Sequence, residues 1–172
     1  HVTAEAFSKI TSKDFVYKIF GDGETRQQIV KAVGDSKKVE LCGLVPRQNI
    51  IEEITNCDIV VMPSLWEGLS IFMLEAMALG RPMMISNVPS LRDVFSEKPL
   101  KTGENWRLCS WGYLVETSNV NAYNEAMNHF LRHQNLSAKM QMEMEKYSTL
   151  YSIEETAKSY MKVYMRCLQQ EN

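Results

Sequence analysis

The fold of this chain is decided by one segment, which reads Pro63-Ser64-Leu65-Trp66-Glu67-Gly68-Leu69-Ser70-Ile71-Phe72-Met73-Leu74-Glu75-Ala76-Met77-Ala78-Leu79-Gly80-Arg81-Pro82. One apolar run, 59–62, precedes it and a second, 83–85, follows it. Short apolar runs are typical of buried strands, so the order strand, loop, helix, strand is predicted. Glu67 lies in the predicted loop, and Glu75 lies eight positions later in the predicted helix.

The predicted helix is indicated by apolar or small residues at intervals of three and four, namely Leu69, Phe72, Met73, Ala76, Met77 and Gly80. Gly80 suits the left-handed conformation just past a helix end, and Pro82 cannot continue a helix. We expect the helix to begin near 68–70, so its free N–H groups and positive dipole end face the loop with Glu67. Such an end attracts phosphate, whereas a carboxylate at the same place is suited to accept hydrogen bonds from hydroxyl groups.

Segments typical of strands and of helices alternate along the whole chain. The predicted strands are 15–20, 39–42, 58–62, 83–85 and 112–115, and the further predicted helices are 2–10, 24–33, 47–55, 89–95, 119–132, 137–147 and 152–168. The polar segment 96–110 is predicted to be an irregular loop. Short strands that are apolar on both faces are typical of a parallel sheet covered by helices on both sides. We therefore predict an α/β fold, a three-layer α/β/α Rossmann-like parallel sheet.

The predicted sheet places three loops at one edge. Ligands bind such sheets at the carboxyl ends of the strands, where the loops 21–24, 43–47 and 63–70 follow. Gly21 and Gly23 flank an aspartate in a pattern typical of a turn, and they either form a plain turn or line a ligand pocket. Gly43 to Val45 either place backbone groups against a ligand or simply end a strand.

Composition excludes several classes of protein. A length of 172 residues predicts one domain over 1–172, whose last helices, about 119–172, pack on it or extend from it. A net charge of −2 with interspersed signs gives no electrostatic basis for binding nucleic acid or an anionic membrane. No apolar run approaches the ~20 residues of a membrane-spanning helix, so no membrane segment is expected.

Metal and redox motifs are not indicated. Cys42, Cys57, Cys109 and Cys167 are far apart in sequence, so we expect reduced and mostly buried thiols. His129 and His133 are four residues apart on one predicted helix, but no third ligand accompanies them, and a solvated helix face is favoured over a metal site.

The central segment also resembles a known family. Pro-Ser-x-x-Glu-Gly is followed by Glu-Ala-Met-Ala-x-Gly-x-Pro, with seven residues between the two glutamates. This pattern resembles the nucleotide-sugar-binding domain of retaining glycosyltransferases with the GT-B fold, in particular glycosyltransferase family 4. Similar segments continue outside the centre, at 20–23, 41–45, 56–64, 86–94 and 112–115.

The resemblance implies a donor-binding domain that supports transfer of a sugar, with retention, from a nucleoside-diphosphate sugar to a glycan or lipid-linked acceptor. Glu75 would accept hydrogen bonds from the donor ribose, and Glu67, the catalytic residue, would contact the donor sugar. The amides of Gly68, Leu69 and Ser70 would face the diphosphate or the sugar and stabilise its developing charge. The remaining donor-binding residues would be Gly21, Gly23, Gly43 and Val45. The family pattern implies no metal and no cofactor, and the absence of an Asp-x-Asp motif from the sequence agrees with that.

The chain departs from the family pattern in two respects. Ser70 stands where the family usually has a glycine, which narrows access to the backbone or adds a hydroxyl hydrogen bond. The basic residues that neutralise the diphosphate, a first strand and an N-terminal acceptor domain are expected to precede this chain, so the fragment alone is expected to be inactive. The full-length protein is expected in the cytoplasm or at the inner membrane face.

Two alternatives stay open. One is a non-catalytic nucleotide- or protein-binding module of the same Rossmann-like fold, because fold alone does not define function. The other is a GT-B nucleotide-sugar epimerase, whose acid–base residues this chain does not display.

Overall fold

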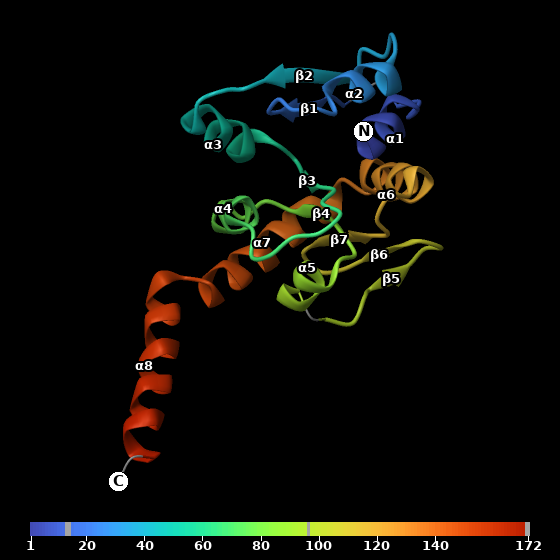
Figure 1. Cartoon of the computed structure of the whole chain (residues 1–172). Coiled ribbons are helices and arrows are strands. Elements are labelled where there is room, and N and C mark those ends of the chain that lie inside the picture. The colour runs from blue at the N-terminus through green and yellow to red at the C-terminus, as the bar shows by residue number, and fades with distance from the viewer. Residues whose placement is uncertain (13–14, 96, 171–172) are drawn as a thin grey trace.

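Strands and helices alternate along the chain in the computed structural model, which describes residues 1–12, 15–95 and 97–170 (Figure 1). The helices are α1 (Val2–Ser8), α2 (Arg26–Val33), α3 (Arg47–Asn56), α4 (Ile71–Ala78), α5 (Pro89–Val94), α6 (Val120–Arg132), α7 (Asn135–Leu150) and α8 (Ile153–Gln170). The strands are β1 (Tyr17–Phe20), β2 (Val39–Gly43), β3 (Val60–Met62), β4 (Met83–Ser86), β5 (Lys101–Thr102), β6 (Trp106–Leu108) and β7 (Gly112–Val115). The predicted alternation is confirmed. Residue 96, the first residue of the predicted loop 96–110, lies outside the described residues.

The strands form two separate sheets. One has five strands in the order β3-β4-β7-β6-β5, and the other consists of β1 and β2 alone. β1 with β2, β3 with β4, and β4 with β7 are parallel pairs, whereas β6 is antiparallel to both β5 and β7. The predicted α/β class is therefore confirmed, but the expectation of a purely parallel sheet is wrong at the β5–β6 edge.

The antiparallel edge lies where the sequence predicted an irregular loop. Trp106 and Leu108 are buried while Arg107 between them is exposed, so these three residues alternate as strand residues do. The Trp106 indole packs against Tyr113 on the neighbouring strand, with ring centroids 5.8 Å apart. This burial outweighs the polar composition of the segment and orders it as a hairpin.

Side chains on the two faces of the sheet enter two different cores. Met83 and Ile85 of β4 belong to one core, and Met84 between them belongs to the other. The first core is formed with α3, α4, α5 and α7, and the second with α1, α6 and Met140 of α7. The three-layer α/β/α arrangement follows from this alternation. Beyond α7, helix α8 extends away from the two cores (Figure 1).

The end of α4 has the predicted geometry. Gly80 adopts a left-handed φ of 63°. Its N–H donates to the Met77 carbonyl at 2.9 Å, and the Arg81 N–H donates to the Ala76 carbonyl at 2.9 Å. These two bonds form a Schellman motif, which satisfies carbonyls left free at a helix end.

The apolar stripe predicted for this helix is only partly correct. Met73, Ala76 and Met77 are fully buried, as predicted. Leu69 is 57% exposed, and Phe72 is 36% exposed. Leu69 precedes the first residue of α4, so it lies in the loop and does not share the buried face of the helix.

Gly112 allows β7 to approach β4 closely. It pairs with Met83, and a Cβ atom at position 112 would lie 1.9 Å from the Met83 carbonyl oxygen. We expect Gly112→Ala to lower the free energy of unfolding by about 3 kcal/mol, because a backbone atom at the centre of the sheet must move. Urea denaturation measures the change. Gly23→Ala is the matched control, because a Cβ there meets no atom within 4 Å. Equal stability of the two variants would contradict the close approach.

Candidate donor-binding site

The loops after β1 and β2 lie together at the carboxyl ends of their strands. The Gly21 N–H donates to the Gly43 carbonyl at 2.7 Å, and both glycines have positive φ angles, of 111° and 68°. The Gly23 N–H donates to the Asp22 carboxylate at 2.9 Å, which closes the turn. The structure thus brings together Gly21, Gly23 and Gly43, as predicted for one edge of the sheet.

The start of α4 lies at the C-terminal end of the predicted range 68–70. Ser70 is the N-cap, and its hydroxyl accepts a hydrogen bond from the Met73 N–H at 3.4 Å. Gly68 and Leu69 therefore lie in the loop, and the first helical residues are Ile71 and Phe72. The free amides of the helix end belong to these two residues, because Ser70 satisfies the Met73 amide.

Glu67 lies in the loop before α4 and is held by two serines. The Ser64 hydroxyl donates to its carboxylate Oε2 at 3.1 Å. The Ser90 hydroxyl, from α5, donates to the Glu67 backbone carbonyl. The side chain is half-buried, and its second carboxylate oxygen is not used in these bonds. The two serines fix the loop and the Glu67 carboxylate, and their hydrogen bonds do not use the second carboxylate oxygen.

Glu75 lies within α4 and forms an ion pair that the sequence did not predict. The Arg47 guanidinium donates through Nε to Glu75 Oε1 at 3.0 Å, and Nη2 donates to the same oxygen. The Glu75 side chain is 18% exposed, whereas that of Arg47 is 77% exposed. Arg47 opens α3, directly after the Gly43–Val45 loop, so this ion pair connects that loop to α4.

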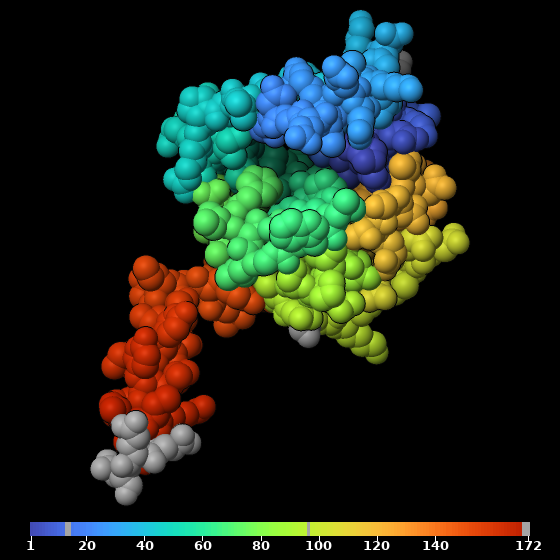
Figure 2. Space-filling model, viewed as in Figure 1, coloured from blue at the N-terminus to red at the C-terminus, as the bar shows by residue number. Residues whose placement is uncertain are grey.

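Arg47 is a site residue that sequence reasoning missed. The only available signal was its place in the 43–47 loop, at the sheet edge where ligands bind. Val45 is half-buried in this loop. Within residues 1–12, 15–95 and 97–170, no backbone hydrogen bond joins the 21–23 turn to the 68–70 loop. A hollow separates these segments on the face shown in Figure 2.

A second polar cluster lies on α6, away from these loops. The Tyr113 hydroxyl is 2.8 Å from His129 Nδ1, and the rings of His129 and His133 stack with centroids 4.2 Å apart. The Trp106 ring lies 5.0 Å from the His129 ring. His129 is thus packed among aromatic rings. In the part of the chain that the structure describes, no three His, Cys, Asp or Glu residues are placed to hold a metal ion.

Among the described residues, no helix is both long and apolar enough to span a bilayer. All four cysteines are free: Cys109 is buried, Cys42 and Cys57 are half-buried, and Cys167 is exposed. Burial raises the pKa of the Cys57 thiol to about 11, so this thiol stays protonated at neutral pH. The expectation of mostly buried thiols is met by Cys109, whereas Cys167 is exposed.

The chain has a mixed sheet with helices on both faces and glycine turns at the strand ends, and two glutamates lie around a helix start. This combination is that of a Rossmann-like domain of the GT-B class. The chain belongs to the family "Glycosyl transferases group 1", which matches residues 1–149.

The chain is similar to glycosyltransferases from other organisms. An uncharacterized glycosyltransferase, MJ1178, from Methanocaldococcus jannaschii is 25% identical over 153 residues, covering 88% of this chain and 40% of the relative. A UDP-Gal:alpha-D-GlcNAc-diphosphoundecaprenol alpha-1,3-galactosyltransferase from Escherichia coli is 34% identical over 79 residues, covering 44% of this chain and 20% of the relative. The chain therefore spans less than half the length of these relatives.

Solved structures show the same fold at low sequence identity. A glycosyltransferase from Rickettsia africae superposes with a TM-score of 0.76 at 17% identity, covering 97% of this chain and 44% of that one. Anabaena Alr3699/HepE in complex with UDP superposes with a TM-score of 0.76 at 15% identity, covering 96% of this chain and 44% of that one. These likenesses confirm the GT-B fold class.

The N-cap of α4 gives a test of local stability. We expect Ser70→Ala to lower the free energy of unfolding by about 0.5–1 kcal/mol, because the Met73 N–H loses its acceptor. Ser70→Gly, which introduces the residue usual in the family, should cost only a few tenths of a kcal/mol. Denaturant titration of both variants measures the difference. An alanine variant as stable as the wild type would exclude the capping role.

The His129 cluster predicts a pH dependence of stability. Burial lowers the pKa of His129 from its ordinary value of 6.5 to about 4. The positive charges of His133, Lys101 and Arg132 act in the same direction. Between pH 6.5 and about 4 the unfolded chain binds a proton that the folded chain does not, so this contribution to stability is lost as the pH falls through that window.

Replacing His129 should remove that part of the pH dependence. We expect the stability difference between wild type and His129→Gln to change between pH 7 and pH 5, in favour of the variant at pH 5. Urea denaturation at both pH values measures it, and Asn121→Gln, an exposed and uncharged position on the same helix, is the control. A difference that is constant with pH would contradict the lowered pKa.

Proposed function

We propose that this chain is the donor-binding domain of a retaining glycosyltransferase that uses a nucleoside-diphosphate sugar. Glu75 carries the proposal, because it is a mostly buried carboxylate with one oxygen held by Arg47. The other oxygen is suited to accept hydrogen bonds from the ribose hydroxyls. Family membership supports a glycosyltransferase, and the UDP bound to the Anabaena protein supports a nucleotide ligand.

The diphosphate would lie between the two glutamates. The loop amides of Gly68 and Leu69 and the first helical amides of α4 supply hydrogen-bond donors there, at the positive end of the helix dipole. Donors that are fixed before the reaction stabilise the charge that develops on a departing nucleoside diphosphate. Gly21, Gly23, Gly43 and Val45 would line the opposite edge of the hollow.

Glu67 would contact the donor sugar and act at the reacting end. The Ser64 hydroxyl orients its carboxylate, and the Ser90 hydroxyl fixes its backbone. The proposal includes no metal ion and no cofactor, since the charge on the leaving group is met by amides. The acceptor, a glycan or a lipid-linked sugar, would be bound by another part of the polypeptide, so the 172 residues alone would not catalyse transfer.

Arg47 would act as a positioning residue for Glu75. A guanidinium has five N–H donors, of which the ion pair uses two, so others are free to meet a phosphate oxygen. An exposed ion pair contributes little to stability by itself. Its role is therefore to fix the direction of the Glu75 carboxylate before the nucleotide arrives.

Calorimetric titration with UDP, GDP and ADP tests the nucleotide site. We expect one of them to bind, and Glu75→Gln to weaken that binding about 10- to 100-fold, because hydrogen bonds to a charged acceptor are worth ~1.5–3 kcal/mol. Glu154→Gln, on the distant α8, is the matched control. Binding that is unchanged in Glu75→Gln would overturn the ribose role, and no binding of any nucleotide would overturn the donor site.

We expect substitution of Glu67 and substitution of Glu75 to weaken the binding of different ligands. Glu67→Gln should leave the affinity for the free nucleoside diphosphate within about twofold, since Glu67 would meet only the sugar. The same variant should weaken binding of the corresponding nucleotide sugar. Equal losses for both ligands would place Glu67 at the nucleotide instead.

A further inference from the structure

A cavity of about 370 Å³ lies outside the donor site, between the β5–β6 hairpin and α6. Its lining includes two residues of the hairpin, Lys101 and Trp106, and four of α6, Glu125, His129, Arg132 and His133. The second half of α6 also lines another cavity together with residues 57–59, which precede β3, so it lies near the amino ends of the parallel strands. The donor site lies at the carboxyl ends, and the cavity is therefore separate from it.

The β5–β6 hairpin places Lys101 on the side of α6. Lys101 pairs with Leu108, and residues directly opposite each other in an antiparallel pair lie on the same face. Leu108 belongs to the core that α6 covers, so Lys101 shares that face. The hairpin turn is closed by the Gly103 N–H, which donates to the Trp106 carbonyl at 2.8 Å. A Cβ atom at position 103 would lie 2.3 Å from the Trp106 ring, so the glycine lets the indole pack over the turn.

Three rings form an ordered wall of this cavity. The ring centroids of Trp106 and His129 are 5.0 Å apart, and the His129 and His133 rings stack at 4.2 Å with 17° between their planes. The Trp106 indole N–H donates to the Glu125 carboxylate at 3.2 Å. The His133 Nδ1–H donates to the His129 carbonyl at 2.8 Å. These contacts fix the wall before any ligand binds.

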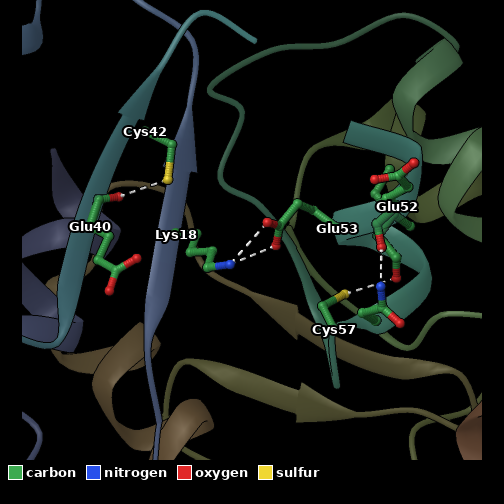
Figure 3. A network of polar contacts seen from close by, with 8 residues as sticks. Lys18, Glu40, Cys42, Glu52, Glu53 and Cys57 are labelled. Atoms are coloured by element: carbon green, nitrogen blue, oxygen red, sulfur yellow. Dashed lines mark hydrogen bonds and ion pairs between the residues drawn. The ribbon is translucent and has the colours of Figure 1, made fainter. Parts of the chain in front are cut away.

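Two permanent positive charges lie at this wall without an ion-pair partner. The Lys101 ammonium is 5.9 Å from the Trp106 ring centroid, and Arg132 lines the cavity from α6. Within the described ranges 1–12, 15–95 and 97–170, neither forms an ion pair with a carboxylate. Lys18 of β1 shows the contrast, because its ammonium lies 2.9 Å from both carboxylate oxygens of Glu53 (Figure 3).

The positive charges converge on the His129 ring. Burial is the main cause of the lowered pKa of His129, and the charges of His133, Lys101 and Arg132 lower it further. Like charges that are held close together repel one another unless an anion joins them. Glu125 also lines the cavity, but its carboxylate is bonded to the indole of Trp106. The cavity therefore has the electrostatics of an anion site.

Each charge has a simpler explanation when it is considered alone. A lysine on an edge strand such as β5 discourages pairing with another chain. Arg132, in the last turn of α6, complements the negative end of the helix dipole. Neither explanation requires that cations from two different elements meet beside the same stacked rings. Their convergence on one cavity is the observation that points to a ligand.

A phosphate monoester matches the charge and the donors of this cavity. It carries about −1.5 to −2 charges at pH 7, which is comparable with the two permanent cations. A guanidinium donates parallel N–H bonds to phosphate oxygens, and an ammonium adds a compact positive charge. A metal ion is a poor match, because the same two cations would repel it.

We propose that the cavity between the β5–β6 hairpin and α6 binds a phosphate monoester, with the phosphate held by Lys101 and Arg132 and the remainder of the ligand against the His129 and His133 rings. The phosphate belongs either to a soluble metabolite or to a lipid headgroup, since both present the same charge and oxygens. The site lies at the other end of the parallel strands from the donor site, and it does not depend on the proposed function.

Proton NMR of the imidazole C–H signals locates the binding. Glucose 6-phosphate is titrated into the 172-residue chain at constant pH, with sodium chloride keeping the ionic strength constant. We expect the His129 and His133 signals to shift and saturate with a dissociation constant on the order of 1 mM or lower. The remaining histidine, His1, is outside the cavity lining and serves as the internal control. Glucose alone should shift none of the three signals.

Substitutions in the lining give effects of opposite sign. Lys101→Gln and Arg132→Gln should each weaken glucose 6-phosphate binding about threefold to tenfold, because each removes a charge that meets the phosphate. Glu125→Gln should strengthen it about twofold or more, because a repelling charge is lost while the amide oxygen still accepts the Trp106 indole N–H. Arg107→Gln is the matched control, because Arg107 is exposed on the same hairpin and outside the lining.

Vesicle sedimentation separates the two sources of the phosphate. Binding to phosphatidylcholine vesicles that contain phosphatidic acid, lost in Lys101→Gln, would assign the site to a lipid headgroup. Saturating NMR shifts without such sedimentation would assign it to a soluble phosphate.

Three results would overturn the proposal. The first is the absence of His129 and His133 shifts with glucose 6-phosphate. The second is equal shifts with sodium chloride at the same ionic strength, which would show charge screening alone. The third is weaker binding in Glu125→Gln, which is the sign expected for a bound cation.

Discussion

The parallel pairing of β4 with β7 is the contact on which both cores depend. Each strand is buried on both faces, so successive side chains supply opposite layers of helices. Met83 and Ile85 face α4 and α7, while Met84 faces α1 and α6. This arrangement needs a short distance between the two strands, and Gly112 provides it where a larger residue would meet the Met83 carbonyl. The helices, and with them the loops of the site, are positioned by this central pair.

The site carboxylates are oriented by hydrogen bonds within the protein. Glu67 is held through Ser64 and Ser90, and Glu75 is held through Arg47. In each case these hydrogen bonds use one carboxylate oxygen, and under the proposed function the other would accept from a ligand. Groups fixed in this way lose little conformational freedom when a ligand binds, which is the physical basis of preorganised recognition.

The fold class and the helix α4 could be predicted because they depend on local patterns. Short apolar runs mark the buried strands, and Gly80 marks the helix end, since its left-handed φ is costly for other residues. The β5–β6 hairpin could not be predicted, because strands of two and three residues are too short to be recognised from sequence and depend on the burial of Trp106. The Arg47–Glu75 ion pair joins residues 28 positions apart, and no local pattern encodes such a contact.

The Arg47–Glu75 ion pair also links elements that belong to the two different sheets. Arg47 is attached through its loop to β2, in the smaller sheet, whereas Glu75 belongs to α4, which packs against the larger sheet. A displacement of one sheet relative to the other therefore changes the direction of the guanidinium and the position of the carboxylate together. The position of the Glu75 carboxylate therefore depends on how the two sheets are aligned.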